Sequence, residues 1–557
     1  MSLLRCSLSL MALASVCAVT APFAQAQESL VLTSAAPAAS KAPVREPINL
    51  EMMAKIREEG MQRSQLPQNL AYLTDVIGPR LTGSPGLDKA NDWTVMKFKE
   101  WGLNAKLQPW GPFGRGWTLE RFSAQAVSPQ CIPLIAFPKA WSPGWNGTKT
   151  AEVVYLDAAD EKDLEKYKGK LKGKFVLLTP PRDVSARFEA DGRRWTEEQL
   201  MAMAENAPRQ ASGNRGQEAA SLTPEQRREL QARTQAIRLT PVKLRFALDE
   251  GALAALDPGR GDVGTVFVQQ ASVALPRDAR PGTRIAPQSK EAEGNILPQV
   301  AVSIEHYNRL IRLIEAGEKV ELAMELKTKF NENPGLMVNN VIAEMPGTDK
   351  AEEIVMCGGH IDSWQAGTGA TDNAAGVAVC MEAVRILKAL GVQPRRTIRV
   401  GLWTGEEQGI FGSRAYVEQQ FGSRLQPKAE HEKFSAYFNL DNGTGKIRGV
   451  YCQGNEAIMP IFAEWLKPFG DLGATTITAR NTGGTDHLPF DAAGLPGFQF
   501  VQDPIEYNAR THHSNQDTYD RIQVEDMKQA AVIMAAFLYN AAMRDDKLPR
   551  KPAAEPR

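Results

Sequence analysis

The sequence has few cysteines and histidines, no excess of either charge, and no long apolar run after its N-terminus. Its 557 residues include six cysteines and six histidines, and 65 basic residues balance 65 acidic ones. A net charge of zero gives no electrostatic reason to expect nucleic acid or an anionic membrane as a partner. The few cysteines, without any CxxC spacing, exclude a disulfide framework and a structural zinc ribbon.

The N-terminus has the pattern of an export signal. Arg5 precedes an apolar run from Leu8 to Val19, and Ala24-Gln25-Ala26 is a small-x-small cleavage pattern. The run is shorter than the roughly 20 residues of a membrane helix. We therefore expect residues 1–26 to be a removed signal peptide, with no membrane anchor after cleavage. The mature protein is expected to be exported, either to the periplasm or to the medium.

Changes in residue pattern divide the rest of the chain. After the signal comes a leader rich in Ala, Pro and Ser, which is expected to be flexible. The helical segment that follows is expected to form the first part of an α/β domain. A β-rich domain follows, with an Arg- and Gln-rich stretch that we interpret as a solvated helical or partly disordered insertion. Regular strand-helix alternation then resumes before a flexible tail. The expected boundaries are 27–48 (leader), 49–110 (first part), 111–325 (β-rich, insertion 182–240), 326–545 (second part) and 546–557 (tail).

Short apolar runs predict the strands. In the second part of the α/β domain they are Asn340–Met345, Ile354–Cys357, Thr397–Trp403, Phe434–Leu440 and Gly497–Val501. In the β-rich domain they are 151–156, 173–178, 264–268 and 299–303. The fold class expected from this alternation is α/β, with a mostly parallel mixed sheet, helices on both faces and an inserted β-rich domain.

Acidic residues and a histidine follow successive strands. His360, Asp362 and Asp372 lie in glycine-rich turns after the strand at 354–357, Glu406 and Glu407 follow 397–403, and Asp441 follows 434–440. In open α/β sheets, ligands bind where the carboxyl ends of the strands meet their loops. These side chains are therefore expected to lie at one edge of the sheet.

Two adjacent histidines, His512 and His513, stand in a polar loop before the final predicted helix. Histidine nitrogens and carboxylate oxygens together suit Zn²⁺, which also tolerates the open position that catalysis needs. A bridging aspartate with one histidine and one carboxylate on each side is enough for two metal ions about 3.5–4 Å apart. The sequence therefore predicts a two-metal hydrolytic site.

The order of these motifs resembles metallopeptidase family 28, the co-catalytic zinc aminopeptidases. The motifs are His360-Ile361-Asp362, Asp372-Asn373, Gly405-Glu406-Glu407, Asp441, and His513-Ser514 followed by Asp517. The doubled histidine and the Ser363-Trp364 pair are most similar to the carboxypeptidase Q-like members. Several members carry a protease-associated domain where this chain has its β-rich domain, and the resemblance implies the same domain here.

The resemblance implies roles for individual residues. Asp372 would bridge two Zn²⁺ ions, and Glu406 would be the general base. The pairs His360 with Asp441, and Glu407 with His513, would each complete one zinc site. Asp362 would orient His360.

Further roles follow from the same resemblance. His512 stands where many members have a tyrosine that stabilises the oxyanion, so either His512 or another group fills that role. His487, in Gly483-Gly484-Thr485-Asp486-His487, would be either structural or in contact with substrate. Arg510 is a candidate for binding the substrate carboxylate.

The function implied is hydrolysis of dipeptides, or of the N-terminal bond of short peptides, by an exported exopeptidase. The partner is a peptide substrate, and a homodimer is left open. Two alternatives remain: a glutaminyl-cyclase-like acyl transferase with a single zinc, and a non-catalytic receptor-like homologue.

Overall fold

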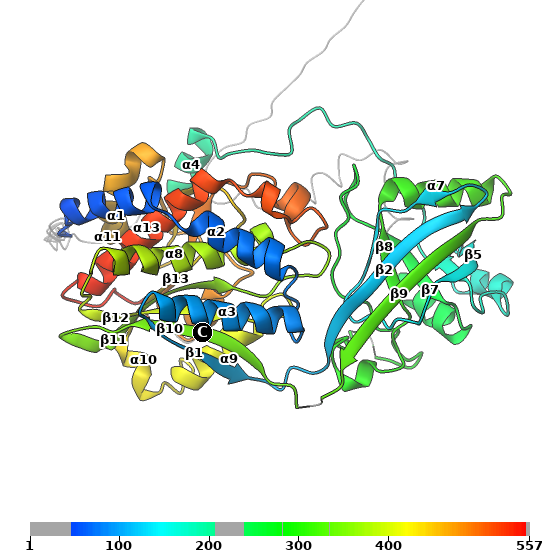
Figure 1. The fold of residues 1–557 in the computed structure, drawn as a ribbon, viewed down its shortest axis with the longest axis horizontal. Coiled ribbons are helices and arrows are strands. Elements are labelled where there is room, and N and C mark those ends of the chain that lie inside the picture. The colour runs from blue at the N-terminus through cyan, green and yellow to red at the C-terminus, as the bar shows by residue number, and fades with distance from the viewer. Residues whose placement is uncertain (1–45, 206–238, 281, 334, 553–557) are drawn as a thin grey trace, which may run out of the picture. The chain divides into compact units, whose positions relative to one another are not determined.

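The computed structural model describes residues 46–205, 239–280, 282–333 and 335–552 (Figure 1). The expected signal peptide, most of the expected leader and much of the 182–240 insertion lie outside these ranges. Among the described helices, none combines the length and the apolar character needed to cross a bilayer.

One sheet carries the α/β part, and eight of its strands lie in the described residues. In spatial order they are β1 (Asn104–Trp110), β10 (Val338–Met345), β12 (Arg396–Trp403), β11 (Lys350–His360), β13 (Phe434–Asn439), β16 (Gly497–Gln502), β14 (Ile447–Tyr451) and β15 (Thr476–Thr478). The central pairs β12–β11, β11–β13 and β13–β16 are parallel, whereas β1–β10, β10–β12 and β14–β16 are antiparallel. The expected mostly parallel mixed sheet is confirmed, although β1, β14 and β15 were not predicted.

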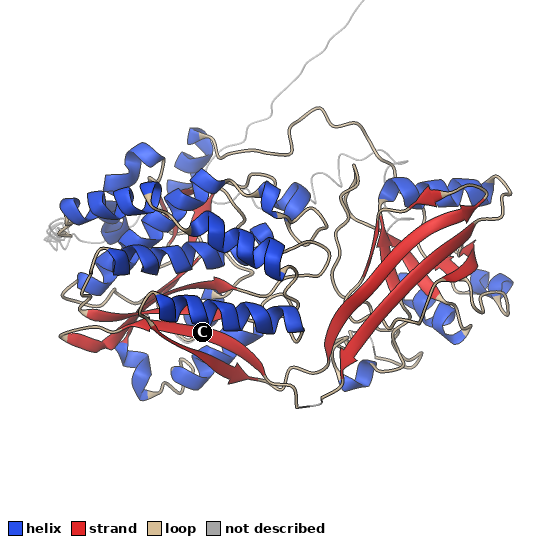
Figure 2. Ribbon diagram, viewed as in Figure 1, coloured by secondary structure: helices blue, strands red, loops and turns tan. Residues whose placement is uncertain are grey.

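Helices bury both faces of this sheet, as Figure 2 shows. Val355 and Cys357 of β11 belong to the apolar core that includes α8 (Ala375–Ala389) and α13 (Val524–Met543). Their neighbours Ile354 and Met356 belong to a second core, with Tyr416 of α9 (Phe411–Gln420). Successive side chains of a strand point to opposite faces, so an unbroken apolar run is what a doubly covered strand requires.

A buried ion-pair cluster joins α8 to α1 (Leu50–Gln62). The Arg385 guanidinium donates to Glu382, one turn earlier on α8, at 2.8 Å and to Glu59 of α1 at 2.9 Å. The side chains of Arg385, Glu59 and Glu382 are 7%, 9% and 0% exposed. Because α8 begins at Ala375, two residues after Asn373, this cluster fixes the helix that leads away from the strand ends.

A second sheet forms the β-rich unit, which we define as residues 116–181 and 241–331. Its order within the described residues is β3 (Ile132–Pro133), β2 (Gly116–Ser128), β9 (Glu321–Asn331), β5 (Lys149–Tyr155), β6 (Phe175–Leu177), β7 (Ala254–Pro258), β8 (Gln299–Val302) and β4 (Ala136–Pro138). The long strands β2 and β9 pair antiparallel, and α7 (Ile304–Glu315) packs its apolar side into this core. The likeness to a protease-associated domain stays a prediction.

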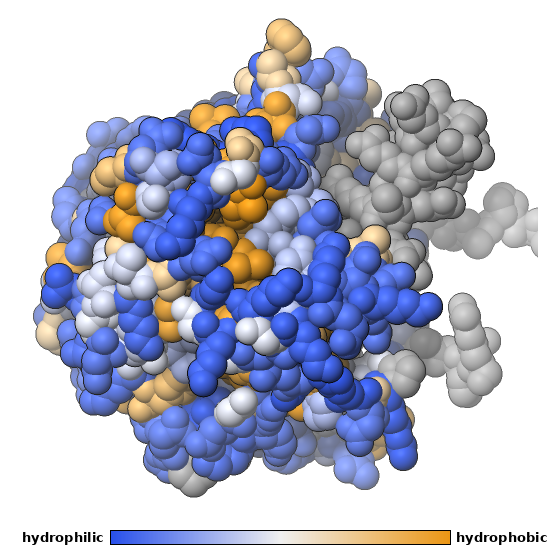
Figure 3. Space-filling view, turned by 90° about the vertical axis from the view of Figure 1, so that its right-hand side faces the viewer, coloured by the Kyte–Doolittle hydropathy of each residue, from blue (hydrophilic) through white to orange (hydrophobic). Residues whose placement is uncertain are grey.

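The surface in Figure 3, which views the molecule from the right-hand side of Figure 1, is mostly hydrophilic. Apolar side chains show between the polar ones, and the exposed hydrophobic residues of the β-rich unit include Val127, Ile135 and Val263. This mixture is that of an ordinary solvated surface.

Two segments differ from expectation. The strand predicted at 264–268 is wrong, because these residues make only an isolated bridge, between Phe267 and Ser514. The helix α4 (Glu197–Ala204) lies in the predicted solvated insertion but buries Leu200 and Met203 against Val501 of β16. In both places the chain contacts loops and strands of the α/β part, and local residue patterns carry no signal for such distant partners.

The α1–α8 cluster gives a stability prediction. Arg385→Ala leaves two buried carboxylates without their common partner, and breaking such a pair costs about 3–5 kcal/mol. We expect a clear fall in the thermal melting temperature. Arg63→Ala is the matched control, because it removes a 53% exposed partner of the same Glu59 and should cost less than about 1 kcal/mol. Equal losses in the two variants would contradict the buried network.

Candidate metal centre

The strand-end residues meet at the carboxyl edge of the central parallel strands. His360 is the last residue of β11 and pairs in register with Trp403, at the end of β12. Gly358 of β11 pairs with Asn439, at the end of β13. Parallel strands in register end at the same edge, so the turns after β11, β12 and β13 lie side by side.

Asp372 lies between two histidines, one on each side of its carboxylate. Its Oδ1 is 3.3 Å from His360 Nε2, and its Oδ2 is 3.2 Å from His513 Nε2. Asp441 Oδ1 lies 3.4 Å from the same nitrogen of His360, and Glu407 Oε2 lies 2.9 Å from that of His513. The five residues therefore form two groups that share Asp372.

The ring of His360 has a fixed orientation. Its Nδ1 lies 3.0 Å from the backbone carbonyl oxygen of Asp362, and because a carbonyl only accepts, Nδ1 donates. In the neutral imidazole Nε2 is then left with its lone pair facing Asp372 and Asp441. The Asp362 carboxylate lies farther from Nδ1, at 3.6 Å.

The Asp362 carboxylate instead supports the turn after β12. It accepts hydrogen bonds from the Thr82 hydroxyl at 2.9 Å and from the backbone N–H groups of Glu406 and Glu407, each at 3.4 Å. Asp362 therefore contacts both His360 and the Glu406–Glu407 turn. Its role is broader than the expected one of orienting His360.

The donor atoms fit a metal. Asp372 Oδ2, Asp441 Oδ1 and Glu407 Oε1 are buried and, apart from the histidine rings beside them, accept no hydrogen bond within the described residues. The groups His360, Asp372, Asp441 and Asp372, His512, His513 each place their ligand atoms within 4.8 Å of one another. Buried carboxylates without partners are costly, and a cation is the partner that this set of N and O donors suits.

The ionisation of these side chains reflects their crowding. Burial disfavours a charged His513, but Glu407 and Asp372 outweigh it and raise its pKa to about 11. Burial and the Asp372 charge raise the pKa of Glu407 to about 7. Burial is likewise outweighed at His360, where Asp441 and Glu406 hold the pKa well above its usual range. Without a metal ion, the neighbouring carboxylates therefore favour the protonated forms of His360 and His513.

Two residues to which the sequence analysis gave no role, Asp517 and Arg80, hold the Asp372 turn. The Asp517 carboxylate accepts the backbone N–H groups of Thr371 at 2.6 Å and Asp372 at 3.2 Å. The buried Arg80 guanidinium donates to the carbonyl oxygens of Ile361, Thr368 and Gly369. The spacing of Asp517 after His513 is part of the family motif and could have indicated a role. Arg80 stands in a turn whose composition gives no such indication.

A cavity of about 530 Å³ opens over the donor groups. Its wall includes Glu406 and the loops at Gly483–Thr485 and Tyr507–Asn508. Burial raises the pKa of Glu406 well above its usual range. Glu406 is thus a half-buried acid that faces the cavity from beside Glu407.

His512 and Tyr507 stack in the wall of this cavity, with ring centroids 4.7 Å apart. His512 Nε2 lies 3.9 Å from Asp372 Oδ2, and burial lowers the pKa of His512. Burial and the Asp372 charge raise the pKa of Tyr507 well above its usual range, so its phenol keeps its proton. Sequence reasoning missed Tyr507, since a tyrosine in a loop carries no pattern.

The two residues named for substrate contact lie elsewhere. His487 is buried at the start of α12 (His487–Ala492), and its Nε2 lies 3.2 Å from the carbonyl oxygen of Thr482. Arg510 forms ion pairs with Asp191 at 2.8 Å and with Glu506 at 3.4 Å. Neither lines the cavity over the donor groups, so a substrate role gains no support from their positions.

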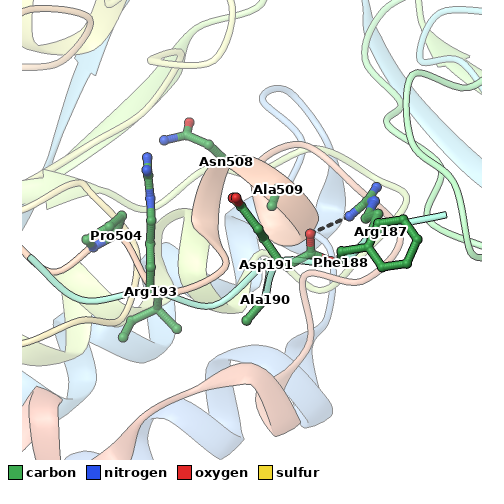
Figure 4. A pocket seen from close by; sticks show the side chains of 10 residues that line it. Arg187, Phe188, Ala190, Asp191, Arg193, Pro504, Asn508 and Ala509 are labelled. Carbon is green, nitrogen blue, oxygen red and sulfur yellow. Dashed lines mark hydrogen bonds and ion pairs between the residues drawn. The ribbon is translucent and has the colours of Figure 1, made fainter. Parts of the chain in front are cut away.

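A second cavity, also of about 530 Å³, adjoins the first at Asn508, which lines both. Its walls are the extended segment 187–193 and the loop 504–509, which pair through the backbones of Arg193 and Ile505. Figure 4 shows the Arg193 side chain running beside this loop toward Asn508. The second cavity thus lies next to the one over the donor groups.

Metal binding is expected to release protons. Because the pKa values of His360 and His513 are raised, both rings are protonated at pH 7 without metal, and each must lose a proton to offer Nε2 as a ligand. Affinity should therefore rise with pH. Titrating metal-free protein with Zn²⁺ in calorimetric buffers of different ionisation enthalpy should show release of about two to three protons, because Glu407, with a pKa of about 7, is also partly protonated at that pH. His306→Gln, in α7 of the β-rich unit, should leave the count unchanged, and heats independent of the buffer would contradict this electrostatic description.

Comparison with known proteins identifies the family. Residues 340–538 match the model of peptidase family M28. Carboxypeptidase Q of Mus musculus is 28% identical over 506 residues, which cover 90% of this chain and 90% of that protein. A peptidase M28 precursor from Shewanella amazonensis SB2B shares the fold with a TM-score of 0.62 and 23% identity, over 91% of this chain and 100% of that one.

A zinc aminopeptidase from Bacillus subtilis also shares the fold, with a TM-score of 0.50 and 19% identity, over 86% of this chain and 95% of that one. The motif order, the fold and the likeness to carboxypeptidase Q along nine-tenths of the chain all agree. Residues 340–538 therefore belong to a peptidase of family M28, the chain is similar to carboxypeptidase Q along nine-tenths of its length, and the protein is a hydrolase of the metallo-exopeptidase class.

Proposed function

We propose that this protein is a zinc-dependent exopeptidase that hydrolyses dipeptides or the N-terminal bond of short peptides. Two zinc ions would be held by Asp372 between them, with His360 and Asp441 on one side and Glu407 and His513 on the other. The observation that carries the proposal is the Asp372 carboxylate, whose two oxygens lie against the Nε2 atoms of different histidines.

When bound, zinc supplies Lewis acidity, which lowers the pKa of a water molecule and polarises the scissile carbonyl. Glu406 faces the cavity and is free of the donor groups, so its carboxylate can take the proton of the attacking water. The same carboxyl group then returns the proton to the leaving amine. Burial raises the pKa of Glu406, which makes its carboxylate a stronger base for the first transfer.

The phenol of Tyr507 and the imidazole of His512 would stabilise the negative charge that develops on the carbonyl oxygen. Both line the cavity, and Tyr507 keeps its proton, so it remains a hydrogen-bond donor. His512 is held by its stacking on Tyr507. In many relatives a tyrosine directly before the histidine ligand stabilises the oxyanion. Here Tyr507, from the neighbouring turn, would share that role with His512.

Substrate longer than a dipeptide would leave the donor groups past Asn508 and enter the second cavity (Figure 4). A single-zinc acyl transferase needs only one of the two donor groups, and a receptor that has lost catalysis needs neither. The presence of both groups around Asp372 favours the two-metal hydrolase.

The proposal includes export, which is supported by the N-terminal sequence pattern. Cleavage after Ala26 would leave Gln27 as the first residue of the mature protein. The intact mass of the protein isolated from the native host should match a chain that starts there, and a mass that retains residues 1–26 would contradict export by a cleaved signal.

The proton-transfer role of Glu406 gives the principal functional test. Glu406→Gln keeps the shape of the side chain but removes the base, so kcat for dipeptide hydrolysis should fall by at least 10²–10⁴-fold. Zinc content should stay near two per chain. Activity close to that of the wild type would contradict the assignment.

Neighbouring variants separate binding from proton transfer. Glu407→Gln should lower the zinc content by about one ion, because Glu407 belongs to one donor group alone. Asp372→Ala should empty both sites together, because its carboxylate is shared. Loss of only one ion on replacing Asp372 would contradict its bridging role.

A further inference from the structure

The β-rich unit reaches the loop that carries His513. The backbone N–H of Val268 donates to the carbonyl oxygen of His513 at 2.8 Å, and Phe267 pairs with Ser514 as an antiparallel bridge. Val266 and Asn515 exchange two further bonds, at 2.7 and 3.1 Å. Residues 266–269 therefore lie along His513–Asn515 like a short strand, although they belong to the other sheet's unit.

These contacts coincide with an unusual backbone conformation. His513 has a φ of 63°, in the left-handed region that residues with a side chain seldom adopt. Such a conformation persists where surrounding contacts hold it, and the Val268 bond acts on the carbonyl of His513 itself. The β-rich unit thus helps to fix the direction in which the His513 ring leaves the chain.

The ring is also contacted directly. The side-chain amide of Gln269 meets His513 Nδ1, with 3.0 Å between Nε2 of the amide and the ring nitrogen. On another side the ring packs edge-to-face against Trp364, with centroids 6.1 Å apart. Gln269 and Trp364 together leave Nε2 directed at Asp372 and Glu407.

The chemistry of a ligating histidine decides which amide atom faces it. If Nε2 offers its lone pair to a metal, the single hydrogen of the neutral ring is on Nδ1 and requires an acceptor. A half-turn of the amide brings Oε1 of Gln269 to the position of Nε2, and the two atoms have nearly the same shape. Gln269 can therefore accept the Nδ1 hydrogen, as carboxylates and carbonyls do beside other metal-binding histidines.

We propose that Gln269 of the β-rich unit is a positioning residue for the metal ligand His513, so that one of the two metal sites is completed from the inserted unit. The inference rests on the proposed role of His513 as a ligand. It gives the β-rich unit a part in metal binding.

The test measures zinc affinity rather than activity. Zinc dissociation constants of the full-length protein are determined by competition with a chromogenic chelator. In Gln269→Leu, which has a similar size but no acceptor, the affinity for one of the two ions should fall about 10–100-fold. Gln269→Glu keeps an acceptor at the same place and should restore the affinity. The melting temperature of the metal-free protein should be the same in all of these variants.

Gln270→Leu is the matched control, since it makes the same change at the next residue, for which the structure shows no side-chain bond in the described residues. Wild-type affinity in Gln269→Leu would overturn the proposal, as would equal weakening by Gln269→Leu and Gln270→Leu, or failure of Gln269→Glu to restore binding.

His513→Ala separates this inference from the proposed function. If that variant keeps both ions, the assignment of His513 as a ligand is wrong, and the Gln269 proposal falls with it. If His513→Ala loses an ion while Gln269→Leu binds as the wild type does, the ligand assignment stands and only the positioning role is overturned.

Discussion

The shared carboxylate of Asp372 is the interaction on which the centre depends. Its two oxygens lie against two histidines that come from opposite ends of the domain sequence, one at the end of β11 and one in the loop before α13. For both contacts to form, the turn around Asp372 must be held rigidly, and the buried Arg80 and Asp517 hold it through backbone groups. Much of the surrounding polar network can be understood as support for one side chain.

Much of this centre could be predicted from the sequence, because it follows from strand ends. Parallel strands that are buried on both faces have apolar runs in the sequence. The acidic residues and the histidine at the ends of these runs, at His360, Glu407 and Asp441, must then meet at one edge of the sheet. The structure brings these residues together with Asp372 and His513. The helices on both faces of the sheet were equally predictable, since the strands alternate between two cores.

The remaining features depend on contacts between distant segments, which leave no periodic signal. Residues 264–268 have the composition of a strand, but their partner is the loop at Ser514. The ion pairs of Arg510 with Asp191 and Glu506 could not be read from a lone arginine in a loop. Tyr507 and Gln269 likewise gain their importance only from the neighbours that the fold gives them.

The most direct test of this account is a crystal structure of the zinc-loaded protein, with anomalous diffraction recorded at the zinc absorption edge. Two strong peaks about 3.5–4 Å apart are expected, one on each side of the Asp372 carboxylate. One peak should adjoin His360 and Asp441, and the other Glu407 and His513. A single peak, or two peaks that do not share Asp372, would contradict the two-metal centre.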